Sequence, residues 1–102
     1  MDKYLMSDGT ILSPGNAIKS WIEDTRWDGH NKVSVNTGSQ WEHQRLHKSR
    51  KGRYWIESWS NWQGALARAE WASEQEAARW LLLNAYEELP EDLIKFRDEL
   101  EE

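Results

Sequence analysis

Cysteine is absent from the 102 residues of this chain. A disulfide framework, a thiol nucleophile and a thiolate zinc site are therefore excluded, and a chain without cysteine suits a reducing compartment. Long apolar runs are missing too, since no stretch approaches the roughly 18 apolar residues of a membrane-spanning helix. The first residues carry an acid at Asp2, so no signal peptide is expected. We expect a cytoplasmic protein that does not enter a membrane.

Apolar residues are scarce, at 38% of the chain, while charged residues reach 30%. Such a composition normally favours disorder. Eight tryptophans argue against disorder, because each indole can bury on the order of 200 Å². A chain of this length is expected to form one core. We therefore predict a single domain over residues 1–102 with a core rich in aromatic side chains.

Signatures of catalysis are also lacking. No serine stands in a nucleophile elbow, and no Gly-rich loop precedes a helix. His43 and His47 have the spacing of a zinc-protease helix, but Gln44 replaces the essential Glu. The segment reads as a strand, where residues four apart are separated by roughly 13 Å, too far to share one metal ion. No catalytic residue, metal or cofactor is predicted, and we do not expect an enzyme.

Charge is distributed unevenly along a chain whose net charge is −5. Residues 43–53 hold five cations and no acid, whereas residues 86–102 hold eight acids against two cations. Two surfaces with opposite binding preferences would follow from this pattern. The same charge distribution would arise equally well if the hairpin tip and the C-terminal helix were simply exposed to solvent.

The N-terminal third contains turn signals between short apolar runs. Asp8-Gly9 predicts a hairpin over residues 4–12. After the break at Pro14-Gly15, Asn16 can cap a short helix over residues 16–25, with Ile18, Trp21 and Ile22 on one face. A strand is predicted around Val33 and Val35, which alternate with polar residues.

Residues 40–63 read as a longer hairpin closed by the loop Arg50-Lys51-Gly52, with Gly where a left-handed conformation is needed. If Ser49 faces Arg53, the pairing is determined, and opposite charges meet at Arg45 and Glu57. The remaining predicted pairs are Leu46 with Ile56, Lys48 with Tyr54, His47 with Trp55, and His43 with Trp59. A slip of one residue would exchange the two faces.

The C-terminal half predicts a strand at residues 68–72 followed by helices. Ser73 and Glu76 form a capping box for a helix over residues 74–86, whose apolar positions cover most of its circumference. A second helix is predicted to begin at Pro90, with Pro90 and the acids Glu91 and Asp92 in its first turn, near the positive end of the helix dipole. The predicted fold is α+β: an antiparallel sheet of roughly three to five short strands packed on a central Trp/Leu-rich helix, with a C-terminal helix alongside.

The hairpin carries the first candidate binding surface. Single-stranded nucleic acid requires aromatic platforms and cations, and one face and the tip of the hairpin offer both. The alternative is that the tryptophans pack beneath the helix of Trp80, and an acidic chain has no long-range attraction for a polyanion. This surface consists of Arg45, Lys48, Arg50, Lys51, Arg53, Trp55 and Trp59.

A second candidate surface lies at the acidic C-terminus, where closely spaced carboxylates could imitate phosphates on a partner protein. The alternative is a solubilising helix end. The residues concerned are Glu91, Asp92, Asp98 and Glu99. Exposed tryptophans are frequent interface anchors, and those in or near predicted loops are Trp27, Trp41, Trp62 and Trp71.

Residues 51–93 carry a pattern that resembles small uncharacterised proteins of bacteria, phages and plasmids. Its parts are Gly52-Arg53-Tyr54-Trp55, Trp62-Gln63-Gly64, Ala69-Glu70-Trp71, Glu76-Ala77-Ala78-Arg79-Trp80-Leu81-Leu82-Leu83-Asn84 and Leu89-Pro90-Glu91-Asp92-Leu93. The resemblance implies a non-enzymatic accessory protein of a mobile element. It would inhibit or regulate by binding a protein partner, in the manner of inhibitors of host defence such as anti-CRISPR proteins. A module for single-stranded nucleic acid is the alternative function.

Overall fold

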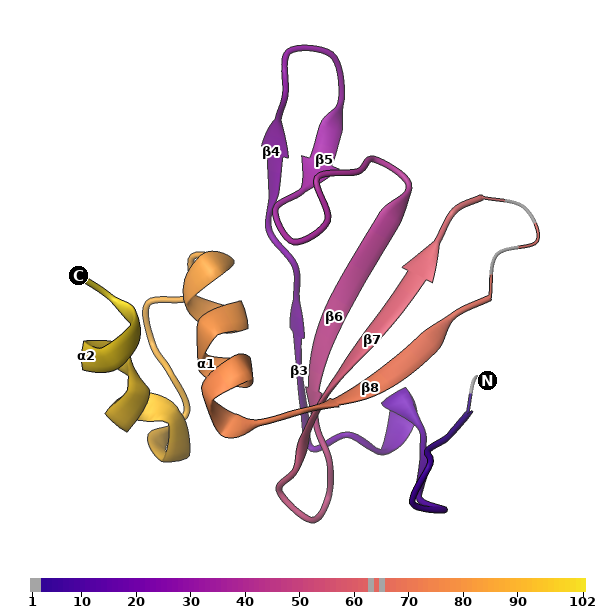
Figure 1. Ribbon diagram of the computed structural model, residues 1–102, viewed down its shortest axis with the longest axis vertical. Helices are drawn as coiled ribbons and strands as arrows, with labels where there is room; N and C mark the ends of the chain where they lie inside the picture. The colour runs from indigo at the N-terminus through magenta and orange to yellow at the C-terminus, as the bar shows by residue number, and fades with distance from the viewer. Residues whose placement is uncertain (1–2, 63, 65) are drawn as a thin grey trace.

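The computed structural model describes residues 3–62, 64 and 66–102; Gln63, the end of the predicted long hairpin, lies outside them. A four-stranded antiparallel sheet forms the centre, in the order β3-β6-β7-β8 (Figure 1). Its strands are β3 (Lys19–Ile22), β6 (Glu42–Lys48), β7 (Tyr54–Ser60) and β8 (Arg68–Ala72). The predicted α+β class is confirmed.

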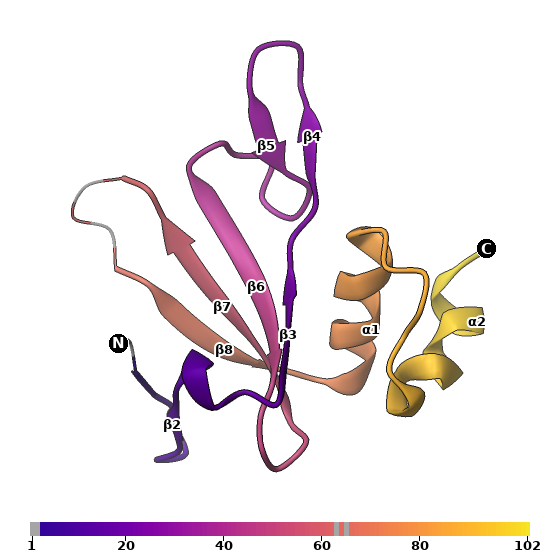
Figure 2. The ribbon, with the colours of Figure 1, turned by 180° about the vertical axis from the view of Figure 1, so that it is seen from behind.

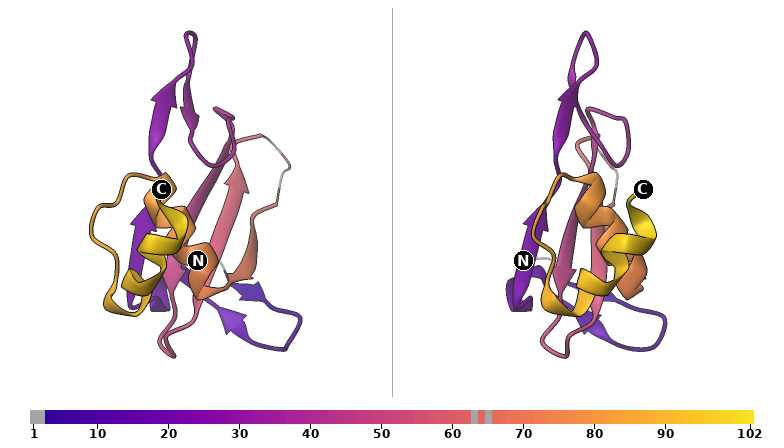
Figure 3. Two further views of the ribbon diagram at one scale, coloured as in Figure 1. Left: turned by 60° about the vertical axis from the view of Figure 1, so that its left-hand side comes forward. Right: turned by 90° about the vertical axis from the view of Figure 1, so that its left-hand side faces the viewer.

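Two small hairpins and three helical segments complete the described chain. The hairpins pair β1 (Tyr4–Leu5) with β2 (Ile11–Leu12) and β4 (Thr25–Trp27) with β5 (Lys32–Ser34). The helical segments are α1 (Glu74–Leu83), the 3₁₀ helix η2 (Glu91–Phe96) continuing into α2 (Arg97–Leu100), and the 3₁₀ turn η1 (Pro14–Asn16). Figure 3 shows β4–β5 projecting away from the sheet. None of the described helices is long and apolar enough to cross a membrane.

The register of the β6–β7 hairpin is the predicted one. Arg45 faces Glu57 and His47 faces Trp55. The backbone N–H of Ser49 donates to the carbonyl of Arg53 at 2.8 Å, which closes the loop. Gly52 has φ = +86°, the left-handed conformation that glycine adopts without steric cost. Local turn chemistry and cross-strand charge were therefore sufficient to predict this pairing.

One face of the sheet packs against the helices. Trp21, Leu46 and Tyr54 point to this side and join one buried cluster with Trp80 and Leu81 of α1. Figures 1 and 2 show α1 and the C-terminal helical turns together on one side of the molecule, away from β1–β2. Ser73 and Glu76 form the predicted capping box at the start of α1, with both backbone bonds at 3.1 Å.

The opposite face packs against the N-terminal hairpin. Met6 and Leu12 cover Trp55, and Tyr4 and Trp71 complete this second cluster. Trp55 is only 1% exposed. The β-sheet therefore lies between two hydrophobic clusters, one under the helices and one under β1–β2.

The predicted helix over residues 16–25 is wrong. That segment forms η1, β3 and the start of β4, and Trp21 pairs with Leu46 of β6. The apolar spacing was ambiguous: only Trp21 is buried, while Ile18 and Ile22 are 61% and 65% exposed. A short apolar run fits both the 3.6-residue period of a helix and the two-residue period of a strand. Pairing with β6 supplies the backbone hydrogen bonds, so tertiary contact overrides the local pattern.

Helix α1 ends at Leu83, three residues before the predicted end. Asn84 is 4% exposed, and its Nδ2 donates to the backbone carbonyl of Trp80 at 2.7 Å and to the side-chain Oδ1 of Asn36 at 2.9 Å. Its Oδ1 accepts from the backbone N–H of Asp24 at 2.7 Å. Ala85 then takes φ = +64° and redirects the chain. One carboxamide thus joins α1 to the segments around β4–β5.

Pro90 precedes η2 rather than occupying its first turn, and η2 is a 3₁₀ helix where an α-helix was expected.

Replacing Asn84 with Ala should lower the free energy of unfolding by about 2 kcal/mol, because the groups bonded to the Asn84 carboxamide lose their hydrogen-bond partner. Urea unfolding followed by tryptophan fluorescence measures this change. Gln75→Ala, at an exposed position of α1, is the control and should change stability by less than about 0.5 kcal/mol. Equal effects of the two substitutions would contradict the role given to Asn84.

Candidate anion-binding pocket

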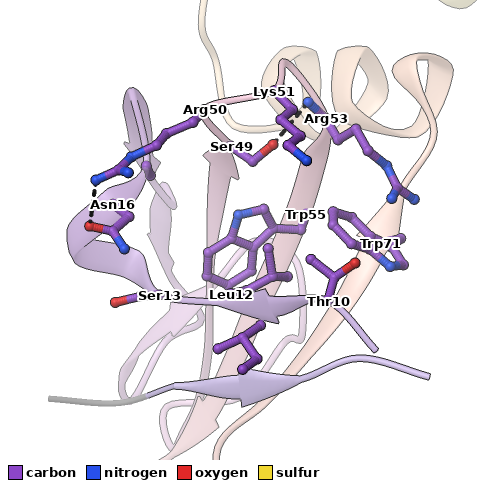
Figure 4. A pocket seen from close by; sticks show the side chains of 12 residues that line it. Thr10, Leu12, Ser13, Asn16, Ser49, Arg50, Lys51, Arg53, Trp55 and Trp71 are labelled. Atoms are coloured by element: carbon purple, nitrogen blue, oxygen red, sulfur yellow. Dashed lines mark hydrogen bonds between the residues drawn. The ribbon is translucent and has the colours of Figure 1, made fainter. Parts of the chain in front are cut away.

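A pocket of about 320 Å³ lies between the N-terminal hairpin and the loop that joins β6 to β7 (Figure 4). The loop contributes Arg50, Lys51 and Arg53. Figure 4 shows these side chains extending over one end of the pocket, above Trp55 and Trp71. Cations and indole rings therefore surround one small volume, which is called the tip pocket below.

Two of the cations are held in place by neighbouring groups. Arg50 Nη2 donates to Asn16 Oδ1 at 3.1 Å. The Arg53 guanidinium lies 3.5 Å from the ring centroid of Trp71, a cation–π contact, and its Nη1 is 3.4 Å from Asp8 Oδ2. Lys51 is exposed and has no hydrogen bond or ion pair within the described parts of the chain. Among the described residues, no carboxylate therefore neutralises Arg50 or Lys51 in the tip pocket.

Asp8 is the acid at the edge of this cluster. The backbone N–H of Thr10 donates to Asp8 Oδ1 at 3.0 Å and, with a smaller contribution from Arg53, holds the pKa of this carboxyl below its usual value. Asp8 remains charged at neutral pH and offsets part of the Arg53 charge. Arg50 and Lys51 therefore supply most of the free positive charge.

The aromatic walls are rigid. The Trp55 ring stacks on His47 with centroids 4.3 Å apart and meets Tyr4 edge-on at 6.0 Å. Trp71 is half-buried, and its Nε1 is buried without a hydrogen-bond partner among the residues described. The wall therefore contains an indole donor that the protein does not satisfy.

The structure brings together four of the seven residues predicted on the basic hairpin: Arg50, Lys51, Arg53 and Trp55. Lys48 points to the helical face, where its Nζ is 3.4 Å from Asp92 Oδ2. Arg45 stacks on Trp59 at 5.4 Å. Trp59 follows Trp55 by four strand positions, roughly 13 Å. The predicted continuous surface is therefore divided.

Trp55 cannot serve as an exposed stacking platform, because the N-terminal hairpin covers its ring. The alternative expectation, that it packs beneath the helix of Trp80, is also wrong for Trp55. Strand alternation directs Trp55 to the face opposite Leu46 and α1. The predicted nucleic-acid surface loses its central aromatic residue.

The four predicted acidic residues are not equivalent. Asp92 is half-buried and accepts a hydrogen bond from Tyr54 Oη at 3.0 Å, in addition to its contact with Lys48. Burial and then the Asp92 hydrogen bond raise the pKa of Tyr54 above its ordinary value. Asp92 thus joins η2 to the β6–β7 hairpin. The exposed members are Glu91, Asp98 and Glu99.

Three of the four tryptophans considered as partner anchors are exposed. Trp27 is 69% exposed at the end of β4, and Trp62 and Trp41 are 60% and 40% exposed. The Trp41 and Trp62 rings lie 4.9 Å apart at the end of the long hairpin remote from its tip. The fourth, Trp71, is a wall of the tip pocket.

A polar cluster that sequence reasoning missed occupies the same sheet face as Trp55. His47 contacts both Ser20 and Glu57, and Tyr4 donates to Glu57. The hairpin register showed that His47 and Glu57 share this face, but Ser20 had been assigned to a helix. His43 instead bonds Glu23 at 2.7 Å. Within the described residues, no three His, Asp or Glu side chains are placed to hold a metal ion.

Comparisons with family models, curated proteins and solved structures gave no match to this chain. The function must therefore be argued from the residues themselves.

Burial lowers the pKa of His47 below its ordinary value near 6.5, against the opposing effect of Glu57. Below about pH 6.5 the unfolded chain then binds a proton that the folded protein does not. The free energy of unfolding should fall with decreasing pH, by at most about 1.4 kcal/mol per pH unit from this group. Urea unfolding between about pH 7 and 5 measures the slope.

The substitution His47→Gln should make that slope shallower. His30→Gln, at an exposed position in the β4–β5 turn, should leave the wild-type slope unchanged. Coincident pH profiles for His47→Gln and the wild type would rule out the assigned contribution.

Proposed function

We propose that the chain is a non-enzymatic binding protein whose tip pocket takes a carboxylate side chain of a partner protein. The observation that carries this proposal is the position of Lys51, a cation without a partner among the described residues, between two restrained guanidinium groups. A carboxylate would accept charge-assisted hydrogen bonds from Arg50 and Lys51. Asn16 already orients Arg50, so binding would cost less ordering of that side chain.

The dimensions and walls of the pocket favour a protein side chain as occupant. A volume of about 320 Å³ holds one or two side chains rather than a length of polymer. The half-buried Trp71 wall would contact the methylene carbons of Glu while its carboxylate meets the cations. Acidic loops and tails of proteins present this combination.

Nucleic acid is less well supported. Trp55 is covered, and Trp59 is distant from the tip. Continuous stacking platforms and a basic groove along the strand are what single-stranded binders need. The tip pocket supplies cations at one point only.

Binding alone would suffice for an inhibitor or regulator, because an occupied acidic surface cannot contact its usual partner. The role on a mobile element, including inhibition of host defence, follows from the resemblance of residues 51–93 and stays a prediction. The exposed acids Glu91, Asp98 and Glu99 extend from another part of the molecule. They could contact a second region of the same partner.

The test uses a fluorescein-labelled, Glu-rich decapeptide, with binding followed by fluorescence anisotropy and by tryptophan emission. We expect binding that weakens as salt increases. The double substitution Arg50→Gln/Lys51→Gln should raise the Kd about tenfold or more, since it removes two charge-assisted contacts.

Lys32→Gln/Lys95→Gln is the matched control, because it removes the same charge at two exposed positions outside the pocket. It should leave the Kd within about twofold of wild type. Equal weakening by both double variants would show that only net charge matters and would refute the site. Tighter binding of a dT decamer than of the peptide would favour the nucleic-acid alternative.

A further inference from the structure

One cross-strand row connects the tip pocket to the open edge of the sheet. Ser20 of β3 faces His47 of β6, His47 faces Trp55 of β7, and Trp55 faces Trp71 of β8. Trp55 and Trp71 line the pocket, whereas Ser20 is exposed on the edge strand. With strands about 4.8 Å apart, Ser20 lies roughly 10 Å from Trp55. An exposed serine thus lies on the same cross-strand row as the two indoles that line the pocket.

The Ser20 hydroxyl belongs to a short hydrogen-bond chain. Its Oγ is 2.6 Å from His47 Nδ1, and His47 Nε2 is 2.9 Å from Glu57 Oε1. Tyr4 Oη donates to the other carboxylate oxygen, Glu57 Oε2, at 2.6 Å. A carboxylate accepts hydrogen bonds, so the ring hydrogen of His47 belongs on Nε2. Nδ1 is then free to accept the hydrogen of the Ser20 hydroxyl.

Packing restrains the middle of this chain while leaving its end accessible. His47 is 1% exposed, Glu57 is 8% exposed, and the His47 ring is stacked on Trp55. This packing holds His47 and Glu57 in one orientation, so no further ordering of the two side chains is needed at the moment of reaction. A hydroxyl oriented by an imidazole, which is itself oriented by a carboxylate, is the arrangement that activates serine nucleophiles on unrelated folds. In this protein Nδ1, rather than Nε2, faces the serine.

We propose that Ser20 is a base-activated nucleophile that accepts an acyl group from an activated ester. In this step Ser20 Oγ forms a bond to the acyl carbon, and the bond from that carbon to the leaving oxygen breaks. The hydroxyl proton passes to His47 Nδ1, and the leaving group departs with the electron pair of the broken bond. A single transfer of this kind goes beyond the binding function and requires no turnover.

The charged and titratable groups around His47 suit it for this role. Burial lowers the pKa of His47, so the imidazole is neutral at pH 7 and able to take a proton. Glu57 acts in the opposite direction and stabilises the imidazolium once it forms, while Arg45 lowers the pKa further. Tyr4 contacts Glu57 from β1.

The experiment incubates the full chain with p-nitrophenyl acetate and locates acetyl groups by peptide mass spectrometry over time. Ser7, exposed in the β1–β2 turn with no hydrogen bond to its hydroxyl among the described residues, reports background reactivity within the same molecule. We expect Ser20 to be acetylated about 100-fold faster than Ser7, the lower range of general-base assistance. Ser20→Ala should remove this fast acetylation.

The variants distinguish activation of Ser20 by His47 from simple exposure of Ser20 to the ester. His47→Gln should reduce the Ser20 rate to that of Ser7, and Glu57→Gln should reduce it partly, with folding verified by near-ultraviolet circular dichroism. In the wild type, the ratio of Ser20 to Ser7 rates should fall only as the pH is lowered below about 6.5, far enough for His47 to take up a proton. Equal rates at Ser20 and Ser7, or a ratio that does not change with pH, would overturn the proposal even if His47→Gln does not fold.

Discussion

The pairing of β6 with β7 determines what each face of the central sheet presents. Because side chains alternate along a strand, the register that places Arg45 opposite Glu57 also directs Leu46 and Tyr54 toward α1. The same register directs His47 and Trp55 toward the N-terminal hairpin. A shift of one residue would exchange the side chains that the two faces present. Both hydrophobic clusters and both proposed sites depend on this pairing.

The N-terminal hairpin shapes the face of the sheet opposite α1. Met6 and Leu12 cover Trp55, Asp8 contacts Arg53, and Tyr4 donates to Glu57. The hairpin therefore supplies one wall of the tip pocket and one end of the chain of hydrogen bonds that leads to Ser20. A strand pair of two residues each has little stability of its own. Its position follows from the apolar and polar contacts it makes with the sheet.

Charge acts locally in this acidic protein. Asp92 neutralises Lys48 and accepts from Tyr54, which stabilises the contact of η2 with the sheet. Asp8 offsets Arg53, so Arg50 and Lys51 carry the free charge of the tip. The cations of residues 43–53 thus have different roles: Lys48 stabilises the fold, and those of the β6–β7 loop line the tip pocket. Net charge alone does not reveal this division, because ion pairing depends on which side chains the fold brings within a few ångströms.

Local signals were sufficient for the β1–β2 turn, the β6–β7 register, β8 and the capping box of α1, since each rests on residues close together in the chain. The α+β class and the cationic tip followed from the same signals. The predicted helix over residues 16–25 is wrong, because a short apolar run fits both the helix period and the strand period, and the pairing of β3 with β6 comes from distant residues. The burial of Trp55, the wall formed by Trp71 and the contact of Ser20 with His47 were likewise decided by tertiary structure. They depend on which strands become neighbours and on which element covers each face, and neither is encoded in residues near one another in the sequence.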